Sequence, residues 1–433
     1  MVNTHKTSFY CLKTTLFVYG RHFKLHFDIK YANLSCMIHS ITIENFFSVA
    51  DSQELNFRVS ANAPDLGCFR DSRAVPGQRL PLIVGVYGPN ASGKSTVLRA
   101  ISTTAWFVQH SFTLPPNNAV PFFNPYAHNN WWNLPTKIAI EYDGQLGENA
   151  PPAVFRYELH IANEPNKFGS EVNYESLSYA PHGKFRRIFE RHQQKFTFGK
   201  EFGITGGDSR IQSIRANASV ISTLAQLNHK ISSDFILSLR GLQTNIFGLD
   251  KANGGLNNAL TFYAQSPDYL KRLNRELSRL DLGLEEMKIH PGNNGPIATF
   301  KHFGLDCDIV LAQESMGTRR FIEIFPLLQF VLDNGGAAVI DEMDTDIHPL
   351  LVPELFRWFY DKERNPKGAQ LLFTAHNPAI LDQLEKEQVF FSEKPSGKPT
   401  HIYGAREIKG FRREPSLMRK YLSGELGAVP HIG

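Results

Sequence analysis

Residues 82–98 read LIVGVYGPNASGKSTVL, an apolar β-branched run that leads into a glycine-bounded loop and then into a second apolar stretch. The loop fits the pattern G-x-x-x-x-G-K-[ST], which predicts a strand, a phosphate-binding loop and a helix in that order. Gly88 and Gly93 let the backbone approach phosphate oxygens, and the loop amides and the helix N-terminus present donors to an anion. Lys94 supplies a positive charge for the β- and γ-phosphates, and Ser95 offers a hydroxyl to Mg²⁺. The predicted nucleotide-binding residues are Gly88, Asn90, Gly93, Lys94, Ser95 and Thr96.

Composition and charge indicate a chain with real hydrophobic cores. It has 433 residues and is 42% hydrophobic, which suffices for two or three compact units. Its formal net charge of +4 permits contact with nucleic acid but does not argue for it. The longest apolar runs are far shorter than the ~20 residues that a membrane span needs, and no cleavable signal pattern is visible. Neither metal-ligand spacing nor a paired framework is seen among Cys11, Cys36, Cys68 and Cys307. We therefore expect a soluble, cytoplasmic protein with free thiols and no membrane partner.

The sequence divides into four segments. Residues 1–36 are either an appended strand or upstream sequence from a start placed too early. We favour the second, because Met37 opens what looks like the natural first strand of a domain. Residues 37–113 form the predicted N-terminal lobe around the phosphate loop, residues 114–310 an insertion, and residues 311–433 a C-terminal lobe.

The insertion combines two kinds of periodicity. Strand-like runs between about 137 and 200 are separated by turn residues and predict an antiparallel meander. Residues from about 215 to 290 read as helical. Their leucines follow 3-4-3-4 spacing at Leu270, Leu273, Leu277, Leu280 and Leu284. Only about two heptads are present, so this spacing favours a core-facing helix over a coiled coil.

The meander ends in a basic segment. Its cationic residues are Lys184, Arg186, Arg187, Arg191, Lys195 and Lys200. A solvated sheet face is the plainer interpretation, and a face that contacts a polyanion is the alternative.

Two further strands end in residues that suit nucleotide chemistry. An apolar run ends in Asp341 and Glu342, and in phosphate-loop ATPases such a strand lies beside the strand of the loop. We expect Asp341 to hold the metal with Ser95, and Glu342 to polarise the water that attacks the γ-phosphate. Another strand ends at His376, and ligands bind at the carboxyl ends of parallel strands. His376 is therefore expected to sense the γ-phosphate, which makes Glu342 and His376 the predicted catalytic pair.

Residues 311–320 read LAQESMGTRR and precede an apolar helix. The Ser-x-Gly at the start of this helix resembles the signature motif of ABC-type ATPases, with two departures from the transporter form. That resemblance implies that the Ser315 hydroxyl and the Gly317 amide bind the γ-phosphate of ATP held by a partner subunit. Residues 344–349 fall where such proteins have the loop that contacts the dimer mate.

Together the motifs resemble a group of small bacterial ABC/SMC-type ATPases related to the RecF and overcoming-lysogenisation-defect proteins, which are often encoded beside restriction or phage-defence genes. The resemblance runs from Met37 to the C-terminus. It rests on residues 43–48 (IENFFS), 88–95 (GPNASGKS), 314–320 (ESMGTRR), 340–344 (IDEMD), 373–377 (FTAHN) and 421–430 (YLSGELGAVP).

The resemblance implies an α/β fold of the P-loop NTPase class and ABC/SMC head type, with a central mixed sheet, an antiparallel β subdomain and a helical insertion. It also implies that ATP with Mg²⁺ is sandwiched between the protomers of a homodimer or higher oligomer and is hydrolysed there. The glutamine that lines the Mg²⁺ site in such proteins is not assigned, and Gln109 is the candidate.

The expected function is an ATP-hydrolysing, nucleotide-driven dimerising switch. It would act as a sensor or regulator in antiviral defence and control a separately encoded effector of the nuclease type. The alternative is a RecF-like DNA repair or recombination ATPase that binds DNA. The ATPase subunit of a membrane transporter fits less well, because about 215 residues separate Thr96 from Leu311. A pseudo-ATPase scaffold would need a broken site, whereas the key residues are all intact.

Overall fold

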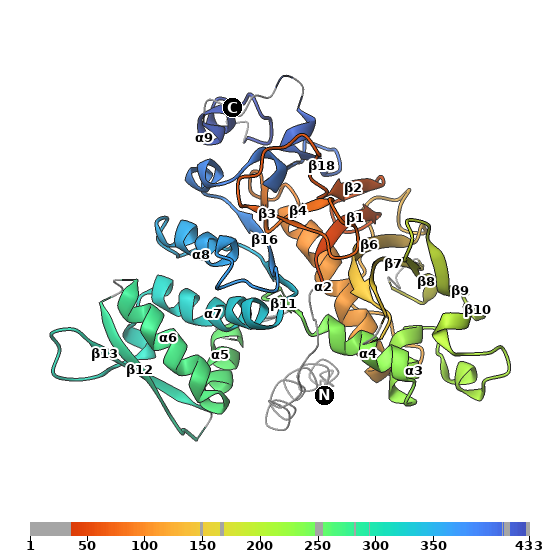
Figure 1. Ribbon diagram of the computed structural model, residues 1–433, viewed down its shortest axis with the longest axis horizontal. Coiled ribbons are helices and arrows are strands. Elements are labelled where there is room, and N and C mark those ends of the chain that lie inside the picture. Colours follow the sequence, from red (N-terminus) through yellow and green to blue (C-terminus); the bar gives the residue numbers. More distant parts are fainter. Residues whose placement is uncertain are drawn as a thin grey trace, which may run out of the picture. The chain divides into compact units, whose positions relative to one another are not determined.

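The computed structural model describes residues 36–147, 150–164, 169–246, 254–280, 283–293, 295–408, 410 and 416–429 (Figure 1). The chain divides into two compact units. The larger comprises residues 33–246, 330–344 and 352–433, and the smaller comprises residues 1–32, 247–329 and 345–351. The prediction for residues 1–36 lies outside the described residues, apart from Cys36.

A six-stranded sheet forms one layer of the larger unit, in the order β11-β15-β16-β5-β17-β18. Its strands are β5 (Ile83–Tyr87), β11 (Leu242–Thr244), β15 (Ala337–Ile340), β16 (Gln370–Ala375), β17 (Val389–Glu393) and β18 (His401–Gly404). All neighbours run parallel except β17 and β18. β5 lies between β16 and β17 and is buried at every position, as expected for a parallel strand covered on both faces.

An antiparallel sheet of seven strands forms the second layer, in the order β10-β9-β8-β7-β6-β1-β2. Its strands are β1 (Ile38–Glu44), β2 (Gln53–Asn56), β6 (Thr136–Gln145), β7 (Pro152–Ile161), β8 (Val172–Ala180), β9 (Arg186–His192) and β10 (Lys195–Phe198). β1 pairs with β2 on one side and with β6 on the other, so the first strand and the meander share one sheet.

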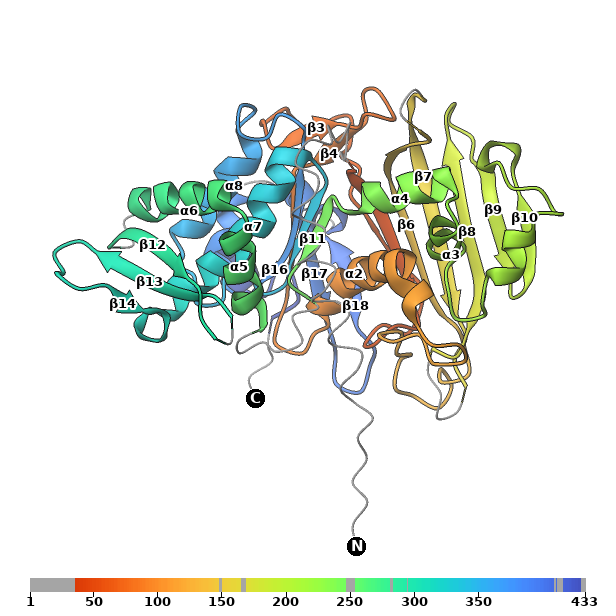
Figure 2. The ribbon, with the colours of Figure 1, turned by 90° about the horizontal axis from the view of Figure 1, so that it is seen from below.

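Helix α2 (Lys94–His110) lies between the two sheets (Figure 2). Twelve of its 17 residues are buried, because both of its long faces are covered. A single core cluster joins α2 to strands of both sheets, through residues such as Val84, Ile101 and Ile140. The short helices α3 (Val220–Gln226) and α4 (Lys230–Leu239) also contact α2.

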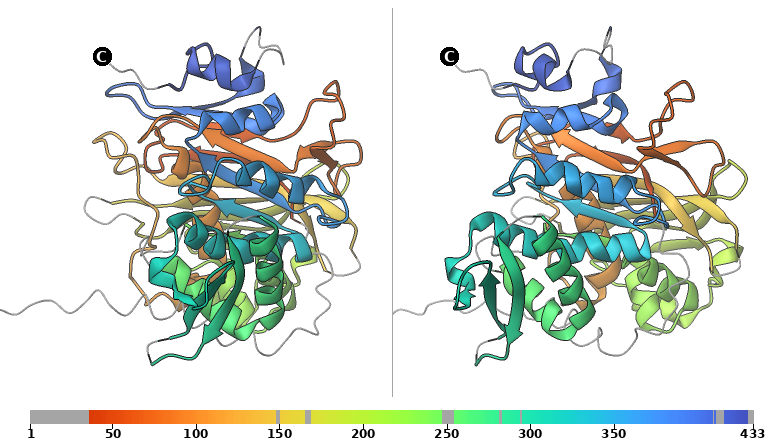
Figure 3. Two further views of the ribbon diagram at one scale, coloured as in Figure 1. Left: turned by 90° about the vertical axis from the view of Figure 1, so that its left-hand side faces the viewer. Right: turned by 60° about the vertical axis from the view of Figure 1, so that its left-hand side comes forward.

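Two helices complete the larger unit. α8 (Leu351–Tyr360) and α2 lie on opposite faces of the six-stranded sheet, and the ring centroid of Phe356 in α8 is 5.2 Å from that of Phe373 in β16 (Figure 1). α9 (Leu417–Leu422) lies beside β17 and β18, where Tyr421 stacks on Phe391 at 5.8 Å (Figure 3). Between β2 and β5 the chain also forms the short hairpin of β3 (Phe69–Asp71) and β4 (Arg79–Pro81). Among the described residues, none of the helices has the length and apolar character that crossing a membrane requires.

Among its described residues, the smaller unit contains two complete helices, the beginning of a third and a three-stranded antiparallel sheet. Its elements are α5 (Gly254–Gln265), α6 (Pro267–Arg279), β12 (Leu284–His290), β13 (Ile297–His302) and β14 (Ile309–Val310). α6 packs against β12, and the side chain of Asn274 exchanges two hydrogen bonds with the backbone of Met287. Helix α7 (Met316–Asn334) begins in this unit and ends in the larger one.

The prediction of a helical region from 215 to 290 is wrong at two places. Residues 242–244 form β11, which extends the six-stranded sheet, and Leu284 begins β12 instead of continuing α6. Leu273 and Leu277 in α6 and Leu284 in β12 are all fully buried. Leu270 and Leu280 are only partly buried, so the leucine spacing reports burial correctly at three of its five positions, and pairing with β13 decides that the last leucine lies in a strand.

A buried ion pair organises the outer half of the seven-stranded sheet. Arg191 in β9 and Glu175 in β8 are both fully buried, with their charged groups 3.5 Å apart. The Arg191 guanidinium also donates to the carbonyl oxygens of Gln193 and Ala218, both at 2.6 Å. Glu175 in turn accepts from the Val220 amide at the start of α3. One residue of the basic segment thus holds β9, β8 and α3 together and does not face solvent.

Replacing Arg191 by alanine should destabilise the larger unit by about 3–5 kcal/mol, because it leaves the Glu175 carboxylate buried without its countercharge. The measurement is urea unfolding followed by circular dichroism. The control is Lys195→Ala on the exposed edge strand β10, expected within about 0.5 kcal/mol of the parent. Equal stabilities for the two variants would contradict the assigned role of the pair.

Candidate functional site

The phosphate loop leaves the carboxyl end of β5, which lies between the parallel strands β16 and β17. β17 and the residue before β18 support it from behind: the carbonyl oxygen of Ser92 accepts from Ser392 at 2.9 Å and from Thr400 at 2.7 Å. A Cβ on Gly88 would collide with the carbonyl oxygen of Ser392, and one on Gly93 would lie 2.5 Å from the Thr400 hydroxyl. The two motif glycines are therefore required by close packing of the loop itself.

Lys94 begins α2 and folds back over the loop. Its ammonium donates to the carbonyl oxygens of Gly88 at 2.9 Å and Pro89 at 3.0 Å, and its Nζ lies 3.3 Å from Nδ1 of His376. The side chain is only 5% exposed. Burial lowers the pKa of Lys94, and three nearby carboxylates, led by that of Asp341, oppose this shift. The Lys94 ammonium thus lies between the phosphate loop and the His376 imidazole.

The hydroxyl of Ser95 and the carboxylate of Asp341, predicted to bind the metal, lie together. Ser95 donates to Oδ1 of Asp341 at 2.9 Å, and Thr374 in β16 donates to the same oxygen at 2.7 Å. Asp341 directly follows β15, and β15 pairs in parallel with β16, so the carboxyl ends of both strands meet here. A hydroxyl and a carboxylate oxygen are hard ligands that suit Mg²⁺, which takes few protein ligands and completes its shell with water and phosphate. The donor set therefore fits the predicted ion.

Thr374 and Asn245 were missed by the sequence reasoning. The Thr374 hydroxyl also accepts from the backbone amide of Glu342 at 2.7 Å, so it connects the two acids of the motif. The Asn245 side chain accepts from the Asp341 amide at 2.8 Å and donates to the Asp341 carbonyl at 3.0 Å. Thr374 stands two residues before His376 and could have been noticed from that spacing. Asn245 precedes Asp341 by 96 residues and no motif marks it.

The remaining predicted residues of the larger unit lie in the phosphate loop, in α2 and directly after β16. Asn90 is exposed at the tip of the loop, and the Thr96 hydroxyl lies 3.0 Å from that of Ser48. His376 is exposed at the end of β16. Gln109 is 15 residues beyond Lys94 on the same helix, about 22 Å along its axis, and donates to the Ala105 carbonyl. The structure does not bring Gln109 to the phosphate loop.

The signature residues belong to the smaller unit. The exposed Ser315 caps α7, because its hydroxyl oxygen accepts from the Thr318 amide at 3.0 Å. A Cβ on Gly317 would lie 2.5 Å from the carbonyl oxygen of Asp346, so the loop before α8 packs directly on the first turn of α7. The preceding Glu314 is buried and lies 2.7 Å from His302 of β13. The Ser-x-Gly turn is thus fixed on three sides within its own unit.

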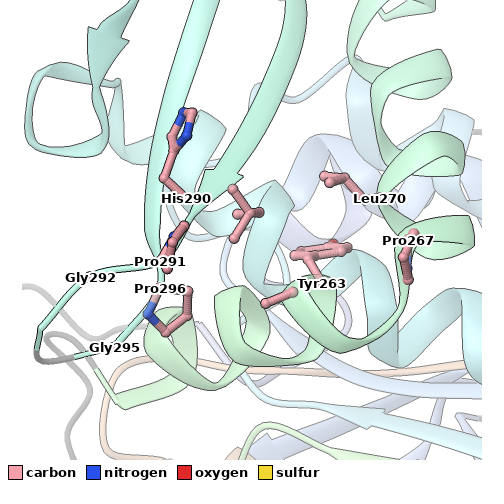
Figure 4. A pocket seen from close by; sticks show the side chains of 10 residues that line it. Tyr263, Pro267, Leu270, His290, Pro291, Gly292, Gly295 and Pro296 are labelled. Atoms are coloured by element: carbon pink, nitrogen blue, oxygen red, sulfur yellow. The ribbon is translucent and has the colours of Figure 1, made fainter.

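A groove of about 600 Å³ lies elsewhere in the smaller unit (Figure 4). It is lined mainly by apolar residues of α5, α6 and the β12–β13 connection, including Tyr263, Leu270 and Pro291. None of the predicted site residues lines it. A groove with so few polar donors does not suit a triphosphate, so its size does not make it the nucleotide site.

The fold and the site define a P-loop nucleotide-binding protein. The phosphate loop follows an inner strand of a mostly parallel sheet, and β16 alone separates that strand from the acidic strand β15. Residues 83–382 match the family described as "AAA domain, putative AbiEii toxin, Type IV TA system". This match covers more than half of the chain, and the chain therefore belongs to that family of AAA-type ATPase domains. The predicted P-loop fold and the predicted resemblance to AAA-type ATPases are thereby confirmed. No curated protein matches the chain.

Solved structures similar to the chain include heads of SMC proteins. The SMC head domain from Thermotoga maritima shares 14% identity with a TM-score of 0.39, over 85% of this chain and 98% of that one. An SMC head bound to the C-terminal winged-helix domain of ScpA shares 10% identity with a TM-score of 0.44, over 86% and 99%. An Smc head domain with an extended coiled coil, bound to the C-terminal domain of ScpA derived from Pyrococcus furiosus, shares 11% sequence identity with a TM-score of 0.41. The match covers 86% of this chain and 97% of that one.

Replacing Thr374 by valine should weaken Mg²⁺-dependent binding of a non-hydrolysable ATP analogue by about 10–100-fold, because it removes the hydroxyl that orients Asp341 and the Glu342 amide. Isothermal titration with and without Mg²⁺ measures the change. Thr197→Val on the exposed face of β10 is the matched control and should bind like the parent. Equal loss of affinity with and without Mg²⁺ would argue against a role at the metal.

Proposed function

We propose that the chain binds ATP with Mg²⁺ and hydrolyses it, and that ATP pairs two copies of the chain into a switch. The observation that carries this proposal is the shared Asp341 oxygen, on which the hydroxyls of Ser95 and Thr374 converge at 2.9 and 2.7 Å. It joins the end of the phosphate loop to the acidic strand. A protein that only bound nucleotide would not need a second acid, Glu342, held by the same Thr374 hydroxyl.

The predicted site residues of the larger unit divide the work of this mechanism between phosphate binding, metal binding and water activation. Lys94 and the loop amides bind the β- and γ-phosphates, and Ser95 and Asp341 would hold the metal. Bound Mg²⁺ supplies charge neutralisation for the phosphoryl oxygens. Glu342 acts as the general base toward water, and His376 contacts the γ-phosphate beside Lys94. The Glu342 backbone has a φ of 52° and is held by Thr374, so the carboxylate starts from a fixed position.

The smaller unit supplies the second half of the site, in our proposal, to another copy of the chain. Ser315 is exposed at the N-terminus of the 19-residue helix α7, where the helix dipole and the first amides favour an anion. The side chains around it fix the turn but leave the hydroxyl accessible. This suits a γ-phosphate presented by a partner, and ATP would then drive closure of a homodimer or higher oligomer.

The biological role we infer is regulation in antiviral defence, through a separately encoded effector. It rests on the family's description as a putative toxin of a type IV TA system and on the lack of any group of three or more metal-ligating acids, histidines or cysteines in the described part of the chain. The DNA-binding alternative receives less support from the basic segment. Arg191 is buried, and Arg187 pairs with Glu190 at 3.0 Å, so fewer cations are free to contact phosphates than the sequence suggested.

Lys94→Ala should lower ATP affinity and abolish turnover, because it removes the charge over the phosphate loop. Glu342→Gln should leave ATP binding largely intact and slow hydrolysis by at least about 100-fold, because it removes only the general base. Phosphate release and nucleotide titration measure both effects on purified protein with Mg²⁺. Hydrolysis that persists in Glu342→Gln at the parental rate would remove Glu342 from the mechanism.

Ser315→Arg should preserve ATP binding by one protomer while abolishing ATP-driven association and hydrolysis, because the arginine blocks the surface that receives the partner's phosphate. Light scattering with and without ATP in the Glu342→Gln background measures association. The control is Ser278→Arg in α6, a position distant in sequence from the signature motif, which should associate like the parent. If hydrolysis survives in Ser315→Arg, the composite site is disproved.

A further inference from the structure

Asp344 lies two residues beyond Glu342 and begins the segment 344–349 that is expected to contact the dimer mate, but that expectation gives it no role in the nucleotide site of its own chain. Its Oδ2 accepts two backbone hydrogen bonds, from the amide of His376 at 2.9 Å and from that of Asn377 at 2.6 Å. Its Oδ1 is buried without a hydrogen-bond partner among the described residues. A buried carboxylate oxygen without a hydrogen-bond partner costs free energy of folding. Local stability alone therefore does not explain why an acid stands at this position.

The two amides that Asp344 binds form the turn carrying the switch histidine. Asn377 continues the turn by accepting the Ala379 amide at 3.0 Å, which starts the short helix η5 (Pro378–Gln383). On the other side, the Met343 amide donates to the Thr374 carbonyl at 3.0 Å. Together with the hydrogen bonds of the Thr374 hydroxyl to Asp341 and to the Glu342 amide, these contacts join the segment after β15 to the end of β16 and to the turn that follows it.

The imidazole of His376 depends on this turn for its place. It is exposed, and its Nδ1 lies 3.3 Å from the Lys94 ammonium nitrogen. The ring is exposed, so the turn that carries His376 governs its placement through the direction of the Cα–Cβ bond. Fixing the backbone amide of His376 fixes that direction.

We propose that Asp344 is the positioning residue of His376. Its carboxylate holds the turn after β16 so that the imidazole stays beside Lys94 at the phosphate loop. This inference rests on the proposed ATPase function for its kinetic consequence, but the geometric part concerns the chain alone.

The geometry distinguishes two substitutions. Asp344→Ala removes both hydrogen bonds, whereas Asp344→Asn can keep them through its carbonyl oxygen and loses only the charge. In ATP turnover, Asp344→Ala should lower kcat by about 10–100-fold with little change in KM, because a misplaced group costs catalysis more than binding. Asp344→Asn should recover most of that loss. Asp306→Ala, an exposed acid in the smaller unit, is the control for charge removal and should match the parent.

A double-mutant cycle tests whether Asp344 acts through His376. His376→Ala and the double variant Asp344→Ala/His376→Ala should have the same kcat, because a turn without its imidazole has nothing left to position. If the double variant instead loses the product of the two single losses, or if Asp344→Ala raises KM and leaves kcat unchanged, the proposal is overturned.

An NMR measurement separates this inference from the ATPase proposal. The ring C–H resonance of His376, assigned by its loss in His376→Ala, should move in nucleotide-free Asp344→Ala and stay near the parental position in Asp344→Asn. Absent hydrolysis by the parent would refute the ATPase function while this spectrum still decides the positioning role. An unmoved resonance in a folded Asp344→Ala protein would refute the positioning role. If Asp344→Ala does not fold, Asp344→Asn decides instead, and a shifted His376 resonance in that folded variant would refute the positioning role.

Discussion

One oxygen atom, Oδ1 of Asp341, connects the parts of the larger unit that act on a nucleotide. It accepts hydroxyls from the first turn of α2 and from β16, while Asn245 fixes the Asp341 backbone from β11's side. This convergence is possible because parallel neighbours bring their carboxyl ends to the same edge of the sheet. A shift of any one strand by a residue would turn its side chains to the other face and break the junction.

Backbone strain is concentrated around that junction. Ala91 in the phosphate loop and Glu342 after the acidic strand both have positive φ, at 61° and 52°, although neither is glycine. Such conformations cost about 1–3 kcal/mol each and persist only where neighbours over-determine them. For Glu342 the neighbour is the Thr374 hydroxyl, which holds its amide. The strain thus falls on the residue proposed as general base, consistent with a carboxylate presented in advance of the reaction.

Charge in the chain is used in two physically different ways. Around Lys94, the carboxylates oppose the desolvation of a single ammonium and keep the loop ready for an anion. In the seven-stranded sheet, the Glu175–Arg191 pair is sealed from solvent and anchors α3 to the meander. A buried pair of this kind contributes specificity of packing more than net stability, since both ions lose their hydration. The basic segment is therefore partly a structural device.

The sequence alone determined the chemistry of the loop and the acidic strand, because G-x-x-x-x-G-K-S and Asp-Glu after an apolar run are local patterns whose function depends on short-range geometry. The leucine spacing also predicted the burial of Leu273, Leu277 and Leu284. It did not determine whether Leu284 lies in a helix or a strand, because β13 supplies the partner of that residue. Only the tertiary structure decided that Gln109 lies far from the loop and that Asn245, Thr374 and Asp344 belong to the site. Those three residues carry common side chains at unremarkable spacings. Their roles arise from hydrogen bonds between strand ends that the sheet alone brings together.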